Sequence, residues 1–121
     1  MAVRKLPRIV AGIALLVVLA GCGKDKSQMS DAELGLDAQQ SSGRQIYNVR
    51  CAGCHTAYSS RGLKGPGLIG LYKKKYLPSG LPANDRFVTQ SIINGRGMMP
   101  AMGDSLTQQQ LADLLAYLHT L

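Results

Sequence analysis

The apolar positions near the end of the chain recur with a helical period. Leu111, Leu114, Leu115 and Leu118 stand at i, i+3, i+4 and i+7, which places them on one face of an α-helix. The preceding segment 107–110, Thr-Gln-Gln-Gln, has the spacing of a capping box, a common helix start. The pattern predicts an amphipathic helix of about 13 residues that buries its leucine face.

A second helix is predicted near the middle of the chain. Ser42 and Gln45 also have capping-box spacing, and apolar positions follow at Ile46, Tyr47 and Val49. We therefore expect the folded domain to begin at residue 41. Gly43 lies in the predicted first turn, where glycine weakens a helix by about 1 kcal/mol relative to alanine. Its presence suggests that another backbone, that of the C-terminal helix, approaches closely there.

The chain between these helices is rich in glycine and proline. Leu71, Tyr72 and Tyr76 suggest a short helix over residues 73–75. A longer helix is expected after an N-cap at residue 84 or 85, ending at Asn94-Gly95. No strand shows convincing alternation, so the predicted fold class is all-α, with the first and last helices of residues 41–121 crossing.

The first 40 residues differ in character from the rest. Residues 1–21 combine a basic patch with a short apolar run from Ile9 to Ala20, the layout of a secretory signal. The run ends in Leu-Ala-Gly-Cys, which resembles a bacterial lipobox and marks Cys22 for lipidation. An uncleaved anchor helix, or a signal cut elsewhere, is the alternative. Residues 22–40 are polar, and we expect them to form a lipidated, flexible tether.

Charge and composition limit the possible functions. The 121 residues contain 14 basic and 7 acidic side chains, for a formal charge of +7. Three cations, Arg4, Lys5 and Arg8, lie in the predicted leader, and the remaining 11 basic against 7 acidic residues leave +4. This mild charge, with few aromatic residues, argues against nucleic-acid binding. With no Trp and one Phe, so small a core would gain from the aromatic mass of a bound cofactor.

The segment Cys51-Ala-Gly-Cys54-His55 indicates what that cofactor is. Cys-x-x-Cys-His is the attachment signature of c-type haem, in which the two thiols bond the porphyrin edge and the histidine binds iron. On a helical turn these three side chains share one face. A thioredoxin-like pair would need a preceding strand, and a zinc site would need a second ligand pair, for which only the isolated Cys22 and His119 remain.

The methionines are candidates for the second iron ligand. Met98, Met99 and Met102 occupy a loop between two predicted helices, beside Gly97 and Pro100. A methionine usually packs in a core, but packing alone does not require such a rigid backbone. His119 is a weaker candidate, because a histidine in the last turn of a helix is commonly solvated and favoured by the helix dipole.

Together these motifs resemble the small class I cytochromes c over roughly residues 41–121. The resemblance is carried by Gly43 with Tyr47, the Cys-x-x-Cys-His segment, Gly65-Pro66-x-Leu68-x-Gly70, Asn94-Gly95-x-Gly97-x-Met99-Pro100, and the terminal helix with Tyr117. It implies loops wrapped around one covalently bound haem c.

The same resemblance assigns individual roles. It implies that Met99, directly before proline, is the axial ligand opposite His55, and that the Pro66 carbonyl accepts the Nδ1 proton of His55. Met98 and Met102 stay as alternatives. By position, the haem walls would be Leu68, Tyr72, Val88 and Ile92.

The sequence therefore predicts a monomeric electron carrier rather than an enzyme. It would be held by Cys22 at a bacterial membrane, facing the periplasm or extracytoplasmic space, and would pass single electrons between redox proteins of a respiratory chain. Lys73, Lys74 and Lys75 are candidates for docking an acidic partner, although such a run is often only a solvated face. The rival functions are a haem sensor or small peroxidase with a labile sixth ligand, and a haem-free lipoprotein with a reactive disulfide.

Overall fold

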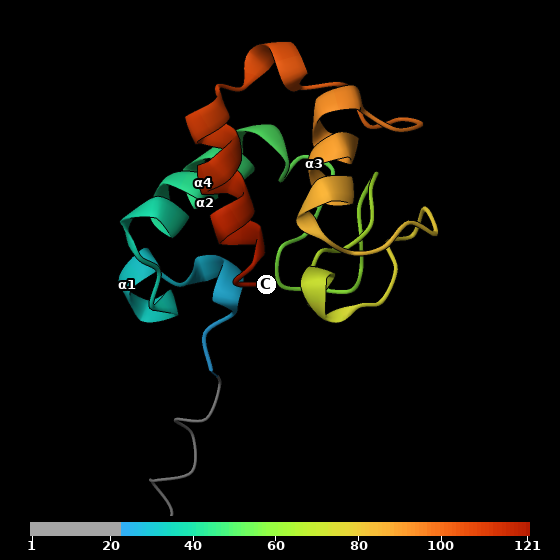
Figure 1. Ribbon diagram of the computed structural model, residues 1–121. Helices are drawn as coiled ribbons and strands as arrows, with labels where there is room; N and C mark the ends of the chain where they lie inside the picture. The colour runs from blue at the N-terminus through green and yellow to red at the C-terminus, as the bar shows by residue number, and fades with distance from the viewer. Residues whose placement is uncertain (1–22) are drawn as a thin grey trace, which may run out of the picture.

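The computed structural model describes residues 23–121, so the predicted leader and Cys22 lie outside the described residues. Four α-helices and three short 3₁₀ turns make up this part of the chain (Figure 1). Their bounds are η1 Lys26–Gln28, α1 Asp31–Leu34, α2 Ala38–Arg50, η2 Leu71–Lys73, α3 Asp85–Asn94, η3 Gly103–Ser105 and α4 Gln108–Leu118. Residues 23–121 contain no β-strand, only two isolated bridges, and none of their helices is long and apolar enough to cross a membrane.

Helix α4 agrees with its sequence pattern. Thr107 caps it, with reciprocal hydrogen bonds to Gln110. On its leucine face Leu111, Leu114 and Leu118 are buried, and Leu115 is partly buried. It packs against α2, and the closest approach is at Gly43. A Cβ atom there would lie 1.9 Å from the carbonyl oxygen of Asp113, so only glycine allows this spacing. The predicted close approach of a second backbone is confirmed.

The predicted start of α2 is wrong. The helix begins at Ala38, and the capping box is formed by Asp37 and Gln40. Ser42 lies inside the helix, where its hydroxyl donates to the carbonyl of Ala38. Gly43 is therefore in the interior of α2, not in its first turn. Both pairs have the same spacing, and the earlier one adds a turn of helix.

The second half of the predicted tether also differs from the expectation of a flexible segment. Residues 31–34 form α1, which has its own capping box between Ser30 and Glu33 and ends at Gly35, with φ +69°. Leu36 then packs against the core. The sequence of α1 itself shows no apolar face, because the residue that attaches this segment to the core, Leu36, lies after the end of the helix.

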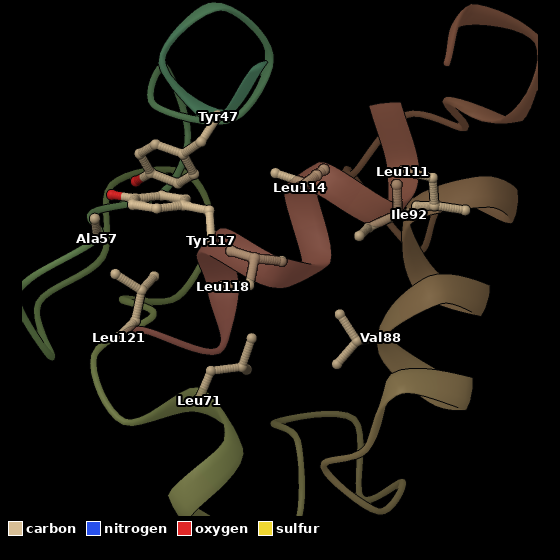
Figure 2. Close-up of a cluster of buried hydrophobic side chains, with 10 residues drawn as sticks. All are labelled: Tyr47, Ala57, Leu71, Val88, Ile92, Leu111, Leu114, Tyr117, Leu118 and Leu121. Carbon is tan, nitrogen blue, oxygen red and sulfur yellow. The ribbon is translucent and has the colours of Figure 1, made fainter. Parts of the chain in front are cut away.

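The core lies between α2, α3, α4 and the loops that connect them (Figure 2). Tyr47 of α2 and Tyr117 of α4 meet with ring centroids 5.4 Å apart. The other buried apolar residues are Ala57, Leu71, Val88, Ile92, Leu111, Leu114, Leu118 and Leu121. Helix α3 begins at an Asn84 cap and ends at Gly95, as predicted. The short helix expected over residues 73–75 is instead η2, which ends at Lys73.

Candidate haem-binding site

The Cys-x-x-Cys-His segment continues directly from the end of α2. The amide of His55 donates to the carbonyl of Cys51 over 2.9 Å, the i to i−4 bond of a helical turn. The hydroxyl of Tyr47 donates to the carbonyl of His55 over 2.8 Å and ties this turn to the helix. Cys51, Cys54 and His55 all line one cavity. The local backbone thus brings both thiols and the imidazole to the same wall.

The following loop orients the imidazole of His55. Its Nδ1 lies 2.8 Å from the carbonyl oxygen of Pro66, the contact that the resemblance implied. A proton on Nδ1 donated to this carbonyl leaves the lone pair on Nε2 for a metal. The amide of Gly65 donates to the carbonyl of Cys54 over 2.8 Å, and a Cβ at Gly65 would lie 2.5 Å from Cε1 of His55. The glycine therefore lets the loop pass directly beside the ring.

The cavity has a volume of about 350 Å³ and a mainly apolar lining. Its opposite walls come from α3, α4 and the loops after the cysteines. Besides the motif residues, its apolar side chains are Pro66, Leu68, Leu71, Leu77, Pro78, Val88, Ile92, Met98, Met99, Pro100, Met102, Leu114 and Leu118. Figure 2 shows Val88 and Ile92 of α3 on the side facing Leu114 and Leu118 of α4.

The methionines stand on a tight turn that closes this cavity. Arg96 and Met99 exchange backbone hydrogen bonds of 3.0 and 2.9 Å around Gly97, whose φ is +56°. Gly95 is also required, because its φ is +69° and a Cβ would lie 2.6 Å from the carbonyl oxygen of Met99. Met99 and Met102 pack against the core, whereas Met98 is 83% exposed. The turn thus places Met99 against the core and leaves Met98 largely in solvent, while Met102 is held just beyond the turn by the hydrogen bond from its amide to the carbonyl of Ile92.

These residues suit a haem. The cavity offers paired thiols for covalent attachment, an oriented imidazole, soft thioether donors and an apolar enclosure. It is also lined by Ser79, whose hydroxyl oxygen is buried and has no hydrogen-bond partner among the described residues. A buried polar group without a partner is costly, and a haem carboxylate would provide the missing acceptor.

Comparison with known proteins agrees with this geometry. The family model described as "Cytochrome C oxidase, cbb3-type, subunit III" matches residues 38–118. The chain belongs to the cytochrome c family. It is 35% identical to cytochrome c-551 of Bacillus subtilis (strain 168), over 79% of this chain and 80% of that one. It is 39% identical to a cytochrome c6-like protein of Nostoc sp., over 62% and 64% of the two chains, and 27% identical to cytochrome c6 of Diacronema lutheri, over 62% and 87%.

The family assignment fixes the cofactor and the general role. Cytochromes c bind their haem covalently and are electron carriers rather than enzymes, so this cytochrome carries a covalently bound haem c. The all-α class I fold expected from the sequence is confirmed. The haem-free disulfide lipoprotein is thereby excluded.

The structure places three of the four expected wall residues on the cavity. Leu68, Val88 and Ile92 line it, but Tyr72 does not. In η2 Leu71 turns inward, and the ring of Tyr72 stacks on His119 with centroids 3.7 Å apart. A 3₁₀ turn has three residues per turn, so neighbouring side chains point about 120° apart. The structure therefore places Leu71 rather than Tyr72 on the cavity wall, and a contact of Tyr72 with the haem stays a prediction.

His119 lies away from the cavity of this cytochrome. Its Nε2 is 2.8 Å from Oδ1 of Asp85, which links the end of α4 to the start of α3. Burial and the nearby Asp85 carboxylate raise the pKa of Tyr72, on which the imidazole stacks. The role of His119 in the structure is to join elements around the site.

Four residues that line the cavity were not predicted from the sequence. Arg50, Lys64 and Arg96 bring positive charge to the lining, and Ser79 brings its hydroxyl. None of these belongs to a periodic pattern, because each depends on how a loop or helix end folds back. Lys73, Lys74 and Lys75 are exposed and do not line the cavity.

Burial changes the acidity of the first thiol of the motif. Desolvation raises the pKa of the Cys51 thiol to about 11. A reactive cysteine needs a lowered pKa to be a thiolate at neutral pH. The raised pKa keeps Cys51 protonated at neutral pH, unlike the reactive cysteine of a thiol–disulfide exchange site. It agrees with an enclosed point of haem attachment.

Proposed function

We propose that this cytochrome is a membrane-tethered, single-haem electron carrier. Cys51 and Cys54 would hold the haem through thioether bonds, with His55 and Met99 as axial ligands. When bound, the haem iron supplies one-electron chemistry between the ferrous and ferric states. The observation that carries the proposal is the convergence of paired thiols, an oriented imidazole and a rigid methionine turn on one apolar cavity.

The protein's own residues would maintain this coordination while the electron passes. The Pro66 carbonyl holds the ring of His55, and the hydrogen-bonded Arg96–Met99 turn limits movement of the thioether. An apolar pocket and a thioether ligand both disfavour the additional positive charge of ferric iron, which raises the reduction potential. A site built in this way moves an electron with little reorganisation.

Residues 1–21 are proposed as a signal peptide, with Cys22 as the lipidated first residue of the mature chain. The support is the lipobox-like sequence Leu-Ala-Gly-Cys after a short apolar run. Two or more acyl chains on one residue give stable membrane attachment, whereas a single chain binds only marginally. The carrier would then work on the outer side of the cytoplasmic membrane, between respiratory redox proteins.

An optical spectrum of the haem-loaded protein tests the ligand set. The proposal expects a low-spin spectrum when reduced, and the weak near-infrared band of methionine-ligated ferric iron when oxidised. Met99→Leu should abolish that band, while Met98→Leu and Met102→Leu should retain it. High-spin bands or ready carbon monoxide binding in the unaltered protein would contradict the proposal. They would instead favour the alternative, a sensor or peroxidase-like protein with a labile sixth ligand.

The partner-docking surface is proposed at Lys73, Lys74 and Lys75, which form an exposed basic run. Replacing all three with Gln should flatten the dependence of the electron-transfer rate on ionic strength, because steering by exposed charges is screened by salt. The matched control replaces the three cations of the cavity lining, Arg50, Lys64 and Arg96. An unchanged salt slope in the lysine variant, with a reduced slope in the control, would move the docking surface to the cavity mouth.

A further inference from the structure

Three side chains outside the haem cavity meet and join the elements that form its walls. Nε2 of His119 lies 2.8 Å from Oδ1 of Asp85, and its imidazole stacks on the ring of Tyr72 with centroids 3.7 Å and planes 11° apart. We call these three residues the wall tie. They belong to three elements, because Asp85 begins α3, Tyr72 lies in η2 and His119 caps the end of α4. None of them lines the cavity itself.

Each member of the wall tie has a close neighbour along its own element that does line the haem cavity. These neighbours are Leu71, Val88 and Leu118. Leu71 and Leu118 are adjacent in sequence to their tie residues, and Val88 follows its own by three positions, on the same face of α3. Figure 2 shows the three side chains around one space. A movement at the wall tie therefore moves three walls of the cavity.

Helix α3 depends on the wall tie because it has few other attachments. Helices α2 and α4 pack closely against each other, whereas α3 makes little direct contact with α4. The cavity lies between α3 and α4, so their facing side chains do not fill the space between them. Among residues 23–121, the pair between His119 and Asp85 is the only ion pair that involves α3.

The same helix carries the methionines. At its C-terminal end, Gly95 leads directly into the hydrogen-bonded turn from Arg96 to Met99. Beyond that turn, the amide of Met102 donates to the carbonyl of Ile92 over 3.0 Å. The methionine segment is thus attached to α3 on both sides of the turn. A displacement of α3 would carry Met99 with it.

From this geometry we infer that the wall tie positions α3 so that Met99 stays on the haem iron. The inference rests on the proposed function, which assigns Met99 as an axial ligand. Tyr72, Asp85 and His119 are positioning residues, since they act through α3 and the cavity walls. The tie would keep the sixth coordination position closed to small external ligands.

Replacement of the methionine by imidazole tests the inference. Met99 must leave the iron before an added ligand can bind, so at saturating imidazole the loss of the near-infrared methionine band in ferric protein reports its departure. His119→Phe keeps an aromatic ring for Tyr72 but removes the ion pair, and Asp85→Asn removes the charge of the other partner. The two side chains are 48% and 58% exposed, and such pairs are weak, so each variant should speed the loss of the band by about 1.5- to 5-fold.

Two further measurements distinguish the wall tie from a general loss of stability. The variant with both changes should be no faster than the faster single variant, because both changes remove the same pair. The matched control is Glu33→Gln, which removes the exposed 2.7 Å ion pair with Lys24 while keeping a residue suited to the capping box of α1. It should leave the rate unchanged. Amide hydrogen exchange should rise in α3 but not in α2 of the tie variants.

The outcomes separate this inference from the proposed function. A resting ferric protein without the methionine band overturns the ligand assignment, and the inference with it. A normal band with unchanged rates in both tie variants overturns the inference alone. So does an equal acceleration in Glu33→Gln, or a double variant whose acceleration is the product of the two single ones. If His119→Phe fails to fold, the rate in Asp85→Asn decides.

Discussion

Replacing Gly43 with alanine should destabilise the cytochrome, although alanine is the better helix former. In an exposed helix interior the change would add about 0.5–1 kcal/mol of stability. At Gly43 the added Cβ would lie 1.9 Å from the carbonyl oxygen of Asp113, 2.6 Å from its carbonyl carbon and 2.8 Å from Cβ of Tyr117. The backbones of α2 and α4 must therefore separate by more than about 1 Å.

The expected magnitude follows from these opposing effects. Overpacking a core costs about 1–3 kcal/mol, and the upper end applies here because the obstructing atoms are backbone rather than a flexible side-chain tip. After subtraction of the helix-propensity gain, the free energy of unfolding should fall by about 2–2.5 kcal/mol. For a domain of this size the melting temperature should fall by roughly 8 to 20 °C.

Urea unfolding of haem-loaded residues 23–121, followed by far-ultraviolet circular dichroism, measures the change. Ser42→Ala is the matched control, because Ser42 is the preceding residue of the same helix and is exposed. It should leave stability unchanged or raise it slightly, since alanine has the higher helix propensity. A Gly43→Ala protein as stable as the unaltered one would refute the close α2–α4 contact as the reason for this glycine.

Three further predictions concern hydroxyl groups around the haem. Tyr47→Phe removes the 2.8 Å hydrogen bond to the carbonyl of His55 and should lower the free energy of unfolding by about 1 kcal/mol at pH 7, measured by the same urea titration. Burial raises the pKa of Tyr47 to about 12 from its ordinary value of about 10, so the contribution of the neutral hydroxyl to stability is full below pH 10 and is lost as the pH rises through 12. Between pH 9 and pH 12 the free energy of unfolding should therefore fall more steeply with pH for the unaltered protein than for Tyr47→Phe. An equal pH dependence in the two proteins would contradict this. Ser79→Ala should lower the reduction potential in a redox titration, because the buried hydroxyl no longer offsets a haem carboxylate, whereas Ser79→Thr should restore it.

Local spacing in the sequence accounts for much of the site. The turn that joins Cys51 to His55 needs only the helical period, and a capping residue followed by an apolar period is enough to locate α3 and α4. The requirement for glycine at position 43 was also visible, because a helix-weakening residue inside a helix needs a packing reason. These features depend on a few consecutive residues, so they can be predicted without the rest of the fold.

Other features depend on contacts between distant segments and appeared only in the tertiary structure. Two capping boxes compete at the start of α2, and packing of Leu36 and the Arg44–Asp31 pair accompany the earlier start. The choice of Leu71 over Tyr72 depends on the narrow pitch of η2, and the free hydroxyl of Ser79 depends on a loop folded over the cavity. The sequence by itself determined which chemical groups are available to attach and ligate a haem, because the spacing of these residues along the chain defines the motif. The tertiary structure decided what surrounds that haem and where α2 begins, because side chains far apart in sequence fix both.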